Sequence, residues 1–325
     1  MYAHRQVDVA LLAVAVVWGS SYLAAKEVAT TESVFGFLVI RFALAAIGLV
    51  VVLGTRLRRI NRAEIVLGGL FGTILAVIFT LETFGLTMTS ASNAGLIISL
   101  TIVMTPLLQR WIHGTRLPAT FYGASVVAVL GVGLLTQRAG YARPGVGDVL
   151  ILLAAAARAA HVIVMAHFSR AHLSGAQFSG ARSLNPGRVT LVQICVCLAV
   201  FSIAAHGTGR GAGDVAAHLS RHGWLITAYL ALVCTVFAFV IQAWAVRRTS
   251  PARVSLLLGT EPLWAAALGI LVAGDPLSLV GVVGAVLVLA GTNWGRTLVA
   301  TTPPAPERVA RRRAMREVEL RPGSL

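Results

Sequence analysis

The stretch "SLLLGTEPLWAAALG" (255–269) places Glu261 and Pro262 between two strongly apolar runs. An ionised carboxylate is costly in hydrocarbon, and a proline removes a helical hydrogen bond. An earlier stretch, "SLTIVMTPLL" (99–108), aligns with it at an offset of 156 residues and places Pro106 opposite Pro262. Paired interruptions of this kind point to a binding site in membrane carriers, whereas single prolines are also tolerated as packing kinks. The alignment alone leaves both interpretations open.

The composition around these stretches indicates an integral membrane protein. Of the 325 residues, 57% are hydrophobic and 12% are charged, where soluble domains carry about 25% charged residues. The apolar residues form blocks of roughly 20, the length that crosses a bilayer as a helix. We predict an all-α membrane protein with ten transmembrane helices, over approximate residues 8–25, 35–53, 65–86, 92–112, 119–137, 148–168, 188–205, 223–246, 251–272 and 277–296.

The chain also repeats internally. "FTLETFGLTMTS" (79–90) matches "FVIQAWAVRRTS" (239–250) and places Glu82 opposite Gln242. Each predicted half contains five helices, an odd number, so the second half must enter the membrane from the opposite side. We therefore predict two inverted five-helix repeats, residues 1–143 and 144–296, an architecture typical of alternating-access carriers. Residues 297–325 form a basic cytoplasmic tail that we expect to be disordered.

The positive charge follows the predicted topology. The formal net charge is +15, and with both termini in the cytoplasm the cytoplasmic segments carry 20 Lys and Arg against 5 in external segments. This distribution fits the positive-inside rule, so the charge indicates a multi-pass protein of the cell membrane that contacts anionic lipid, not a nucleic-acid binder. The three cysteines lack zinc or disulfide spacing, and we expect no metal or cofactor.

Charged side chains inside the predicted helices are the candidates for a functional site. Arg158 and Glu261 are expected at matching mid-membrane depth, facing each other across a central cavity with His161 one turn away. A zwitterionic or carboxylate substrate could displace this pair, or the pair could be a permanent structural salt bridge. Pro262 would add a polar wall, and Trp18 would offer a flat aromatic face or serve as helix packing.

A second group is expected to act in coupling or gating: Arg41, Glu82, Pro106 and Gln242. Glu82 is predicted near the external end of its helix, where pairing with Arg41 is sterically plausible, and Gln242 near the cytoplasmic end of a different helix. Glu82 is the candidate carrier of a coupling proton. For Arg41 the competing interpretation is a buried pair or a side chain that extends to the headgroups.

The sequence resembles the EamA-type members of the drug/metabolite transporter superfamily. The resemblance rests on "WGSSY" (18–22), "RFALAA" (41–46), "GLTMTSASNAGLIISLTIVMTPLL" (85–108) and the long stretch "YLALVCTVFAFVIQAWAVRRTSPARVSLLLGTEPLWAAALGILVAGDPLSLVGVVGAVLVLAG" (229–291). It implies a ten-helix bundle with a central cavity that moves small organic molecules, often outward. The pair Gly274-Asp275 replaces the Gly-Glu that such proteins usually carry after helix nine.

We therefore expect a secondary transporter, an exporter of small organic metabolites or drugs, either uncoupled or proton-coupled. The chain has no G-x-S-x-G, H-E-x-x-H or phosphate-loop motif, which argues against an enzyme and against ATP-driven transport. The alternative is a membrane enzyme or lipid-handling protein without transport activity. The sequence leaves open the substrate, and whether the chain forms a homodimer.

Overall fold

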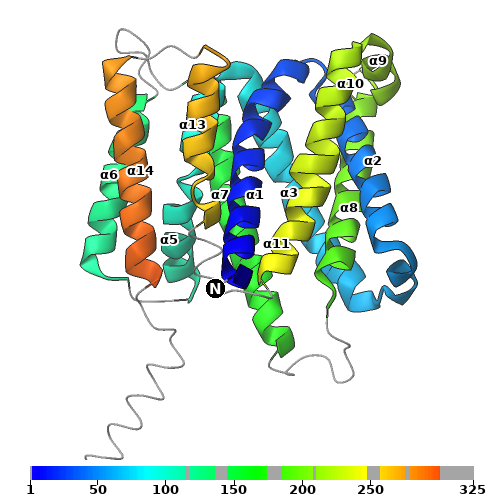
Figure 1. Cartoon of the computed structure of the whole chain (residues 1–325), viewed down its shortest axis with the longest axis horizontal. Coiled ribbons are helices and arrows are strands. Elements are labelled where there is room, and N and C mark those ends of the chain that lie inside the picture. Colours follow the sequence, from blue (N-terminus) through cyan, green and yellow to red (C-terminus); the bar gives the residue numbers. More distant parts are fainter. Residues whose placement is uncertain are drawn as a thin grey trace, which may run out of the picture.

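Long apolar helices lie side by side in a single bundle (Figure 1). The computed structural model describes residues 2–113, 117–135, 145–173, 184–207, 210–246, 257–274 and 278–300, and within these ranges all regular structure is helical. The first part of the chain forms α1 (Tyr2–Val28), α2 (Val34–Leu53), η1 (Gly54–Arg59), α3 (Arg62–Met88), α4 (Ala91–Ile98), α5 (Thr101–His113) and α6 (Ala119–Leu135). The second part forms α7 (Val146–Leu173), α8 (Pro186–Gly207), α9 (Ala212–His218), α10 (Arg221–Ala228), η2 (Tyr229–Phe237), α11 (Ala238–Val246), α13 (Glu261–Leu271) and α14 (Leu279–Ala300).

The helices have the length and surface of membrane-spanning segments. Seven helical segments within the described ranges are long and apolar enough to cross a membrane, and three shorter apolar helices accompany them, Ala119–Val132, Glu261–Leu271 and Leu279–Gly295. Large apolar side chains point away from the bundle, with Val51 and Ile203 each 75% exposed and Leu271 81% exposed. Such a surface suits lipid rather than water. The expected all-helical membrane protein is confirmed, while ten crossings in two inverted halves stay a prediction.

Two of the predicted helices are interrupted. In the first, the interruption does not lie at Pro106, where the sequence predicted it. The block 92–112 divides into α4 and α5 at Ser99–Leu100, and Pro106 lies inside α5. The turn forms earlier because the Ser99 hydroxyl donates to the Leu96 carbonyl at 2.6 Å, and the Leu100 amide bonds only three residues back. These local hydrogen bonds compete with the regular helical pattern before the proline is reached.

In the second half the proline does mark the start of a helix. A turn at Gly259–Thr260, in which the Thr260 hydroxyl donates to the Leu257 carbonyl at 2.7 Å, precedes α13. Pro262 lies in the first turn of α13, where its missing N–H removes no helical bond. Glu261 is therefore the first residue of a helix rather than a residue in the middle of one. Residues 251–256, the expected beginning of this segment, lie outside the described residues.

Small residues bring α13 against α1 and α4. A Cβ atom built on Gly19 of α1 would lie 2.6 Å from the Cβ of Trp264 and 2.8 Å from the backbone nitrogen of Ala265. A Cβ atom on Gly95 of α4 would collide with the Cβ of Ala265. Only glycine permits backbones to approach this closely, as is common at helix contacts in membranes. This packing holds the first turn of α13 beside the middle of α1.

The end of the chain departs slightly from the sequence prediction. Helix α14 continues to Ala300, so residues 297–300 are helical rather than part of the tail. The helix continues because apolar residues extend past Arg296 to Ala300, and the proline pair comes only at 303–304. The expected disordered tail is otherwise residues 301–325, which lie outside the described residues. The N-terminus and the last turn of α14 are at the same end of the bundle (Figure 1).

Candidate functional site

Four side chains from four helices meet inside the bundle. They are Tyr22 of α1, Glu82 of α3, Arg158 of α7 and Glu261 of α13, which we call the central cluster. Arg158 Nη2 donates to Glu82 Oε2 at 2.8 Å, and Arg158 Nη1 lies 4.0 Å from Glu261 Oε1. The Tyr22 hydroxyl donates to the same Glu261 oxygen at 2.9 Å. The Arg158 guanidinium therefore lies between the carboxylates of Glu82 and Glu261, and the Tyr22 hydroxyl holds the Glu261 carboxylate in place.

The central cluster is only partly enclosed. The side chains of Glu82 and Glu261 are 10% and 14% exposed, whereas 31% of the Arg158 side chain is accessible. Charges inside a membrane protein pair with one another or face a polar pathway, because either alone is costly in hydrocarbon. In the central cluster the charges are paired, and part of the Arg158 side chain remains accessible. A small charged solute could therefore compete for these groups.

Glu82 pairs with a different arginine from the one expected. Arg41 was the sterically plausible partner, but no ion pair joins the two among the residues that the structure describes, and Glu82 bonds to Arg158. Helix side chains lean toward the helix N-terminus, so Arg158 extends toward the start of α7. Helix α3 lies against that start, where a Cβ atom on Gly85 would come within 2.8 Å of Ile151. The long arginine side chain thus reaches Glu82, one turn before Gly85.

The other candidates for the substrate site lie around the central cluster. Trp18 donates from Nε1 to the Cys234 carbonyl at 2.9 Å and meets the Phe239 ring edge-on at 6.0 Å, so it ties α1 to η2 and α11. His161 stands one turn after Arg158 on α7, with its ring 6.1 Å from that of Phe71. The Nε2 atom of His161 is buried without a hydrogen-bond partner within the described part of the chain. Pro262 is buried beside Glu261.

The remaining candidates for coupling or gating are spread over three helices. Arg41 is 6% exposed in α2, with its guanidinium carbon 5.0 Å from the centre of the Phe79 ring. Gln242 is half-buried on α11, and Pro106 is buried in α5. The structure thus places Glu82 in the central cluster and leaves Arg41, Gln242 and Pro106 outside it.

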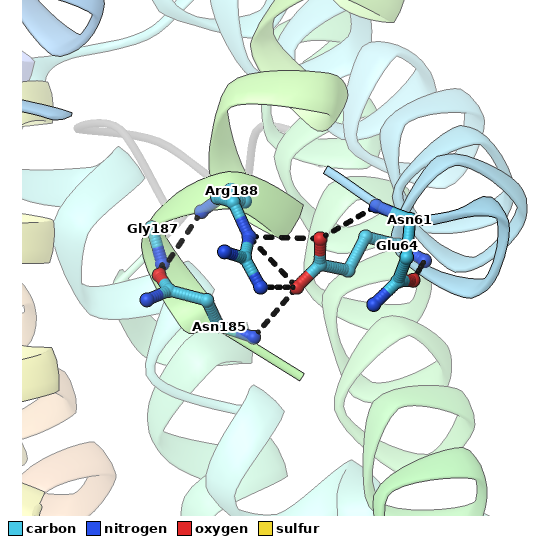
Figure 2. A network of polar contacts seen from close by, with 5 residues as sticks. All are labelled: Asn61, Glu64, Asn185, Gly187 and Arg188. Atoms are coloured by element: carbon cyan, nitrogen blue, oxygen red, sulfur yellow. Dashed lines mark hydrogen bonds and ion pairs between the residues drawn. The ribbon is translucent and has the colours of Figure 1, made fainter. Parts of the chain in front are cut away.

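The most enclosed ion pair of the described residues joins α3 to α8 and was not among the predicted site residues (Figure 2). Glu64 of α3 is 0% exposed and Arg188 of α8 is 8% exposed. Arg188 donates from Nη2 to Glu64 Oε1 at 2.7 Å and from Nε to Glu64 Oε2 at 2.8 Å. The backbone amide of Asn185 donates to Glu64 Oε1 at 2.8 Å, and that of Asn61 to Oε2 at 3.1 Å. We call these four residues the α3–α8 clamp.

A sequence signal for the clamp was present. "NRAE" (61–64) has an Asn followed three residues later by Glu, which is a capping-box pattern, and both of its hydrogen bonds form. Arg188 stands at the predicted cytoplasmic start of the segment 188–205, where a positive charge is expected from topology alone. What the pattern could not give is the partner, because the contact between α3 and α8 joins residues more than 120 positions apart.

A second polar contact ties helices together at the other end of α3. The Lys26 ammonium donates to the Thr89 carbonyl, and the Thr89 hydroxyl donates to Asp148 Oδ1. These residues join the ends of α1 and α3 to the start of α7. Within the described residues no three His, Cys, Asp or Glu side chains gather as a metal site would require.

Comparisons with known proteins agree with this architecture. The model of the EamA-like transporter family matches residues 6–137 and 145–294, two successive segments that together span most of the chain. The chain belongs to the EamA-like transporter family. This family lies within the drug/metabolite transporter superfamily, so the chain is a multi-pass membrane transporter of small solutes.

Individual relatives are more distant. An "Uncharacterized transporter" of Archaeoglobus fulgidus is 26% identical over 286 residues, covering 87% of this chain and 83% of that protein. One solved crystal structure, 18% identical, covers 90% of this chain and 97% of its own with a TM-score of 0.54. At that identity the structure supports the fold alone.

Proposed function

We propose that this transporter is a secondary exporter of small organic metabolites or drugs in the cell membrane, and that the central cluster binds its substrate. The observation that carries the proposal is that each half of the chain supplies two of the four residues of the central cluster. Tyr22 and Glu82 belong to the first family-matched segment, and Arg158 and Glu261 to the second. The Arg158–Glu82 and Tyr22–Glu261 hydrogen bonds therefore both join the two halves. The longer Arg158–Glu261 contact lies within the second half.

This arrangement suits alternating access in an inverted repeat of ten helices. Carriers of that architecture bind their substrate where the repeats meet and rock one half against the other. A charged substrate would replace the Arg158–Glu82 and Tyr22–Glu261 contacts with contacts of its own. The two halves could then separate on one side without leaving a charge unpaired in the membrane. Because only a bound substrate supplies those contacts, the same exchange would link binding to movement.

Transport in this scheme is either uncoupled or driven by a proton gradient. The central cluster offers two carboxylates to one guanidinium, so a proton on one carboxylate would leave the other fully paired with Arg158. Such a proton is a chemically suitable coupling ion because its release would restore the negative charge that holds the halves together. We keep Glu82 as the candidate carrier, since a proton on Glu82 would weaken the closest charge contact between the two halves.

The experiment is solute export by the purified full chain in liposomes, screened with and without a pH gradient. We expect saturable movement of at least one class of charged organic solute, lowered at least tenfold in Arg158→Gln because charge-assisted hydrogen bonds contribute about 1.5–3 kcal/mol each. Arg210→Gln is the matched control, because Arg210 forms an exposed pair with Glu32. It should transport as the wild type does.

Two results would overturn the proposal. One is a wild-type protein that moves no solute but turns over lipid, which would make the chain a membrane enzyme or lipid-handling protein. The other is an Arg158→Gln variant that folds and transports at the wild-type rate with unchanged KM. That result would leave the family assignment intact and remove the central cluster from substrate binding.

A further inference from the structure

One charged residue near the central cluster has a buried hydrogen-bond donor for which the described residues supply no acceptor. Arg41, in the middle of α2, is 6% exposed, and its Nε atom is buried without an acceptor in the described part of the chain. Among those same residues no carboxylate forms an ion pair with it, because Glu82 is bonded to Arg158. A guanidinium stays protonated in proteins, so Arg41 cannot relieve this burial by losing its proton.

The surroundings of Arg41 compensate its charge only partly. The Phe79 ring lies 5.0 Å from the guanidinium carbon, and Phe79 and Phe201 both meet the Phe42 ring edge-on, at 4.9 and 5.2 Å. An aromatic face attracts a cation but accepts no hydrogen bond in the guanidinium plane. The donors of Arg41 therefore remain suited to a planar anion, which a guanidinium binds through two parallel bonds.

The position of Arg41 connects it to the proposed substrate site. Phe79, whose ring lies 5.0 Å from the Arg41 guanidinium carbon, is one turn before Glu82 of the central cluster on α3. Helix α2 also packs against η2, where a Cβ atom on Gly48 would come within 2.7 Å of Leu232. Helix η2 is a nine-residue π-helical stretch, an irregularity that is frequent at functional sites. On the same stretch the Tyr229 hydroxyl shares a 2.6 Å hydrogen bond with Ser20 of α1. Arg41 thus lies on a helix that contacts both α3, which carries Glu82, and η2.

We propose that Arg41 binds the carboxylate group of the substrate, which makes the substrate class small organic acids, with the apolar part of the molecule against the half-buried Phe79 ring. The inference rests on the proposed function and deepens it, since Arg41 would bind the acid group beside the central cluster. A buried arginine without a partner is costly for the ligand-free protein. It is retained, on this proposal, because the substrate supplies the missing anion in each transport cycle.

The test measures binding rather than transport. Purified full-length protein is titrated with benzoate and phenylacetate, each paired with its neutral amide, while the melting temperature is recorded. We expect the acids to raise the melting temperature and the amides to leave it unchanged. In Arg41→Met the acid-dependent rise should be lost, with the Kd for acids weakened roughly tenfold or more. Arg41→Lys, which keeps the charge without the planar fork, should retain part of the effect.

A matched control separates binding from structure. Arg188 is an equally buried arginine, but its partner is Glu64. Ligand-free Arg41→Met should melt at or above the wild-type temperature, because it removes an unpaired charge, whereas Arg188→Met should melt lower. Equal stabilisation by acids and amides, no stabilisation by any acid, or a retained acid effect in Arg41→Met would each overturn the inference. If the liposome screen then shows export of cationic solutes, the proposed function stands although this inference fails.

Discussion

At the scale of single residues, the two glutamates of the central cluster have different partners. Glu82 bonds directly to Arg158 at 2.8 Å, while Glu261 accepts the Tyr22 hydroxyl and lies 4.0 Å from Arg158. Removing one partner of a buried pair leaves the other charge uncompensated, which is more costly than the pair itself is favourable. Glu82 is therefore the carboxylate whose protonation would most change the contact between the two halves.

A substitution that keeps the shape of Glu82 tests its role in coupling. If Glu82 carries the proton, Glu82→Gln should abolish the dependence of export on the pH gradient while substrate exchange continues, because a permanent amide imitates the protonated acid. The measurement is solute efflux from liposomes at equal and unequal pH. Glu27→Gln, at an exposed residue paired with His222, serves as the control. Gradient dependence that survives in Glu82→Gln would exclude Glu82 as the proton carrier.

At the scale of helices, polar contacts hold α3 at both ends. The α3–α8 clamp joins its start to α8, and the Lys26–Thr89–Asp148 contact joins its end to α1 and α7. Between them α3 carries Glu82, so its position along the helix axis is set by groups at a distance from the central cluster. The clamp is a structural ion pair, because it has three direct hydrogen bonds and two backbone donors and is almost fully enclosed.

The clamp predicts a specific pattern of stabilities. Glu64→Ala should lower the free energy of unfolding by about 3–5 kcal/mol, since it leaves the Arg188 charge buried and unpaired. The double variant Glu64→Ala, Arg188→Met should recover much of that loss, because both charges are then gone. Glu32→Ala, in the exposed pair with Arg210, should cost at most about 1 kcal/mol. Denaturant unfolding in mild detergent measures all three, and a double variant less stable than Glu64→Ala would contradict the assignment.

At the scale of the whole molecule, the two ends of the bundle can be assigned to the two sides of the membrane. Its N-terminus and the last turn of α14 are at one end, as an even number of crossings requires (Figure 1). The arginine-rich helix η1 (Gly54–Arg59) is at the same end, whereas α9 is at the other. The distribution of 20 to 5 positive charges in the sequence favours placing the first end in the cytoplasm.

A reporter that is active only outside the cytoplasm tests this orientation. Fused after Gly211, which directly precedes α9, it should be active; fused after Gly295, near the end of α14, it should be silent. The reason is that positively charged loops remain on the cytoplasmic side of the membrane. Cell extracts that contain equal amounts of both fusions provide the control. The reverse pattern of activity would invert the membrane orientation and the assignment of cytoplasmic termini.

The sequence by itself determined the helical class, the membrane-spanning character of the chain and the charged residues that were candidates for a functional site. Those properties depend on local hydrophobic length and on the cost of charge in hydrocarbon, which any single segment reveals. Arg158 and Glu261 were correctly expected to lie near each other, because their positions along two helices fix their depth. Local pattern also contained the Asn61–Glu64 capping box, although its partner was not foreseen.

Tertiary structure alone decided which charges meet. Glu82 pairs with Arg158 rather than Arg41 because the glycine contacts between α3 and α7 bring those helices together, and depth along one helix says nothing about its neighbours. For the same reason Glu64 pairs with Arg188 on the neighbouring helix α8, and Arg41 has no acidic partner among the described residues. Depth is a property of one segment, whereas the choice of partner depends on how helices far apart in the sequence rotate and pack against one another.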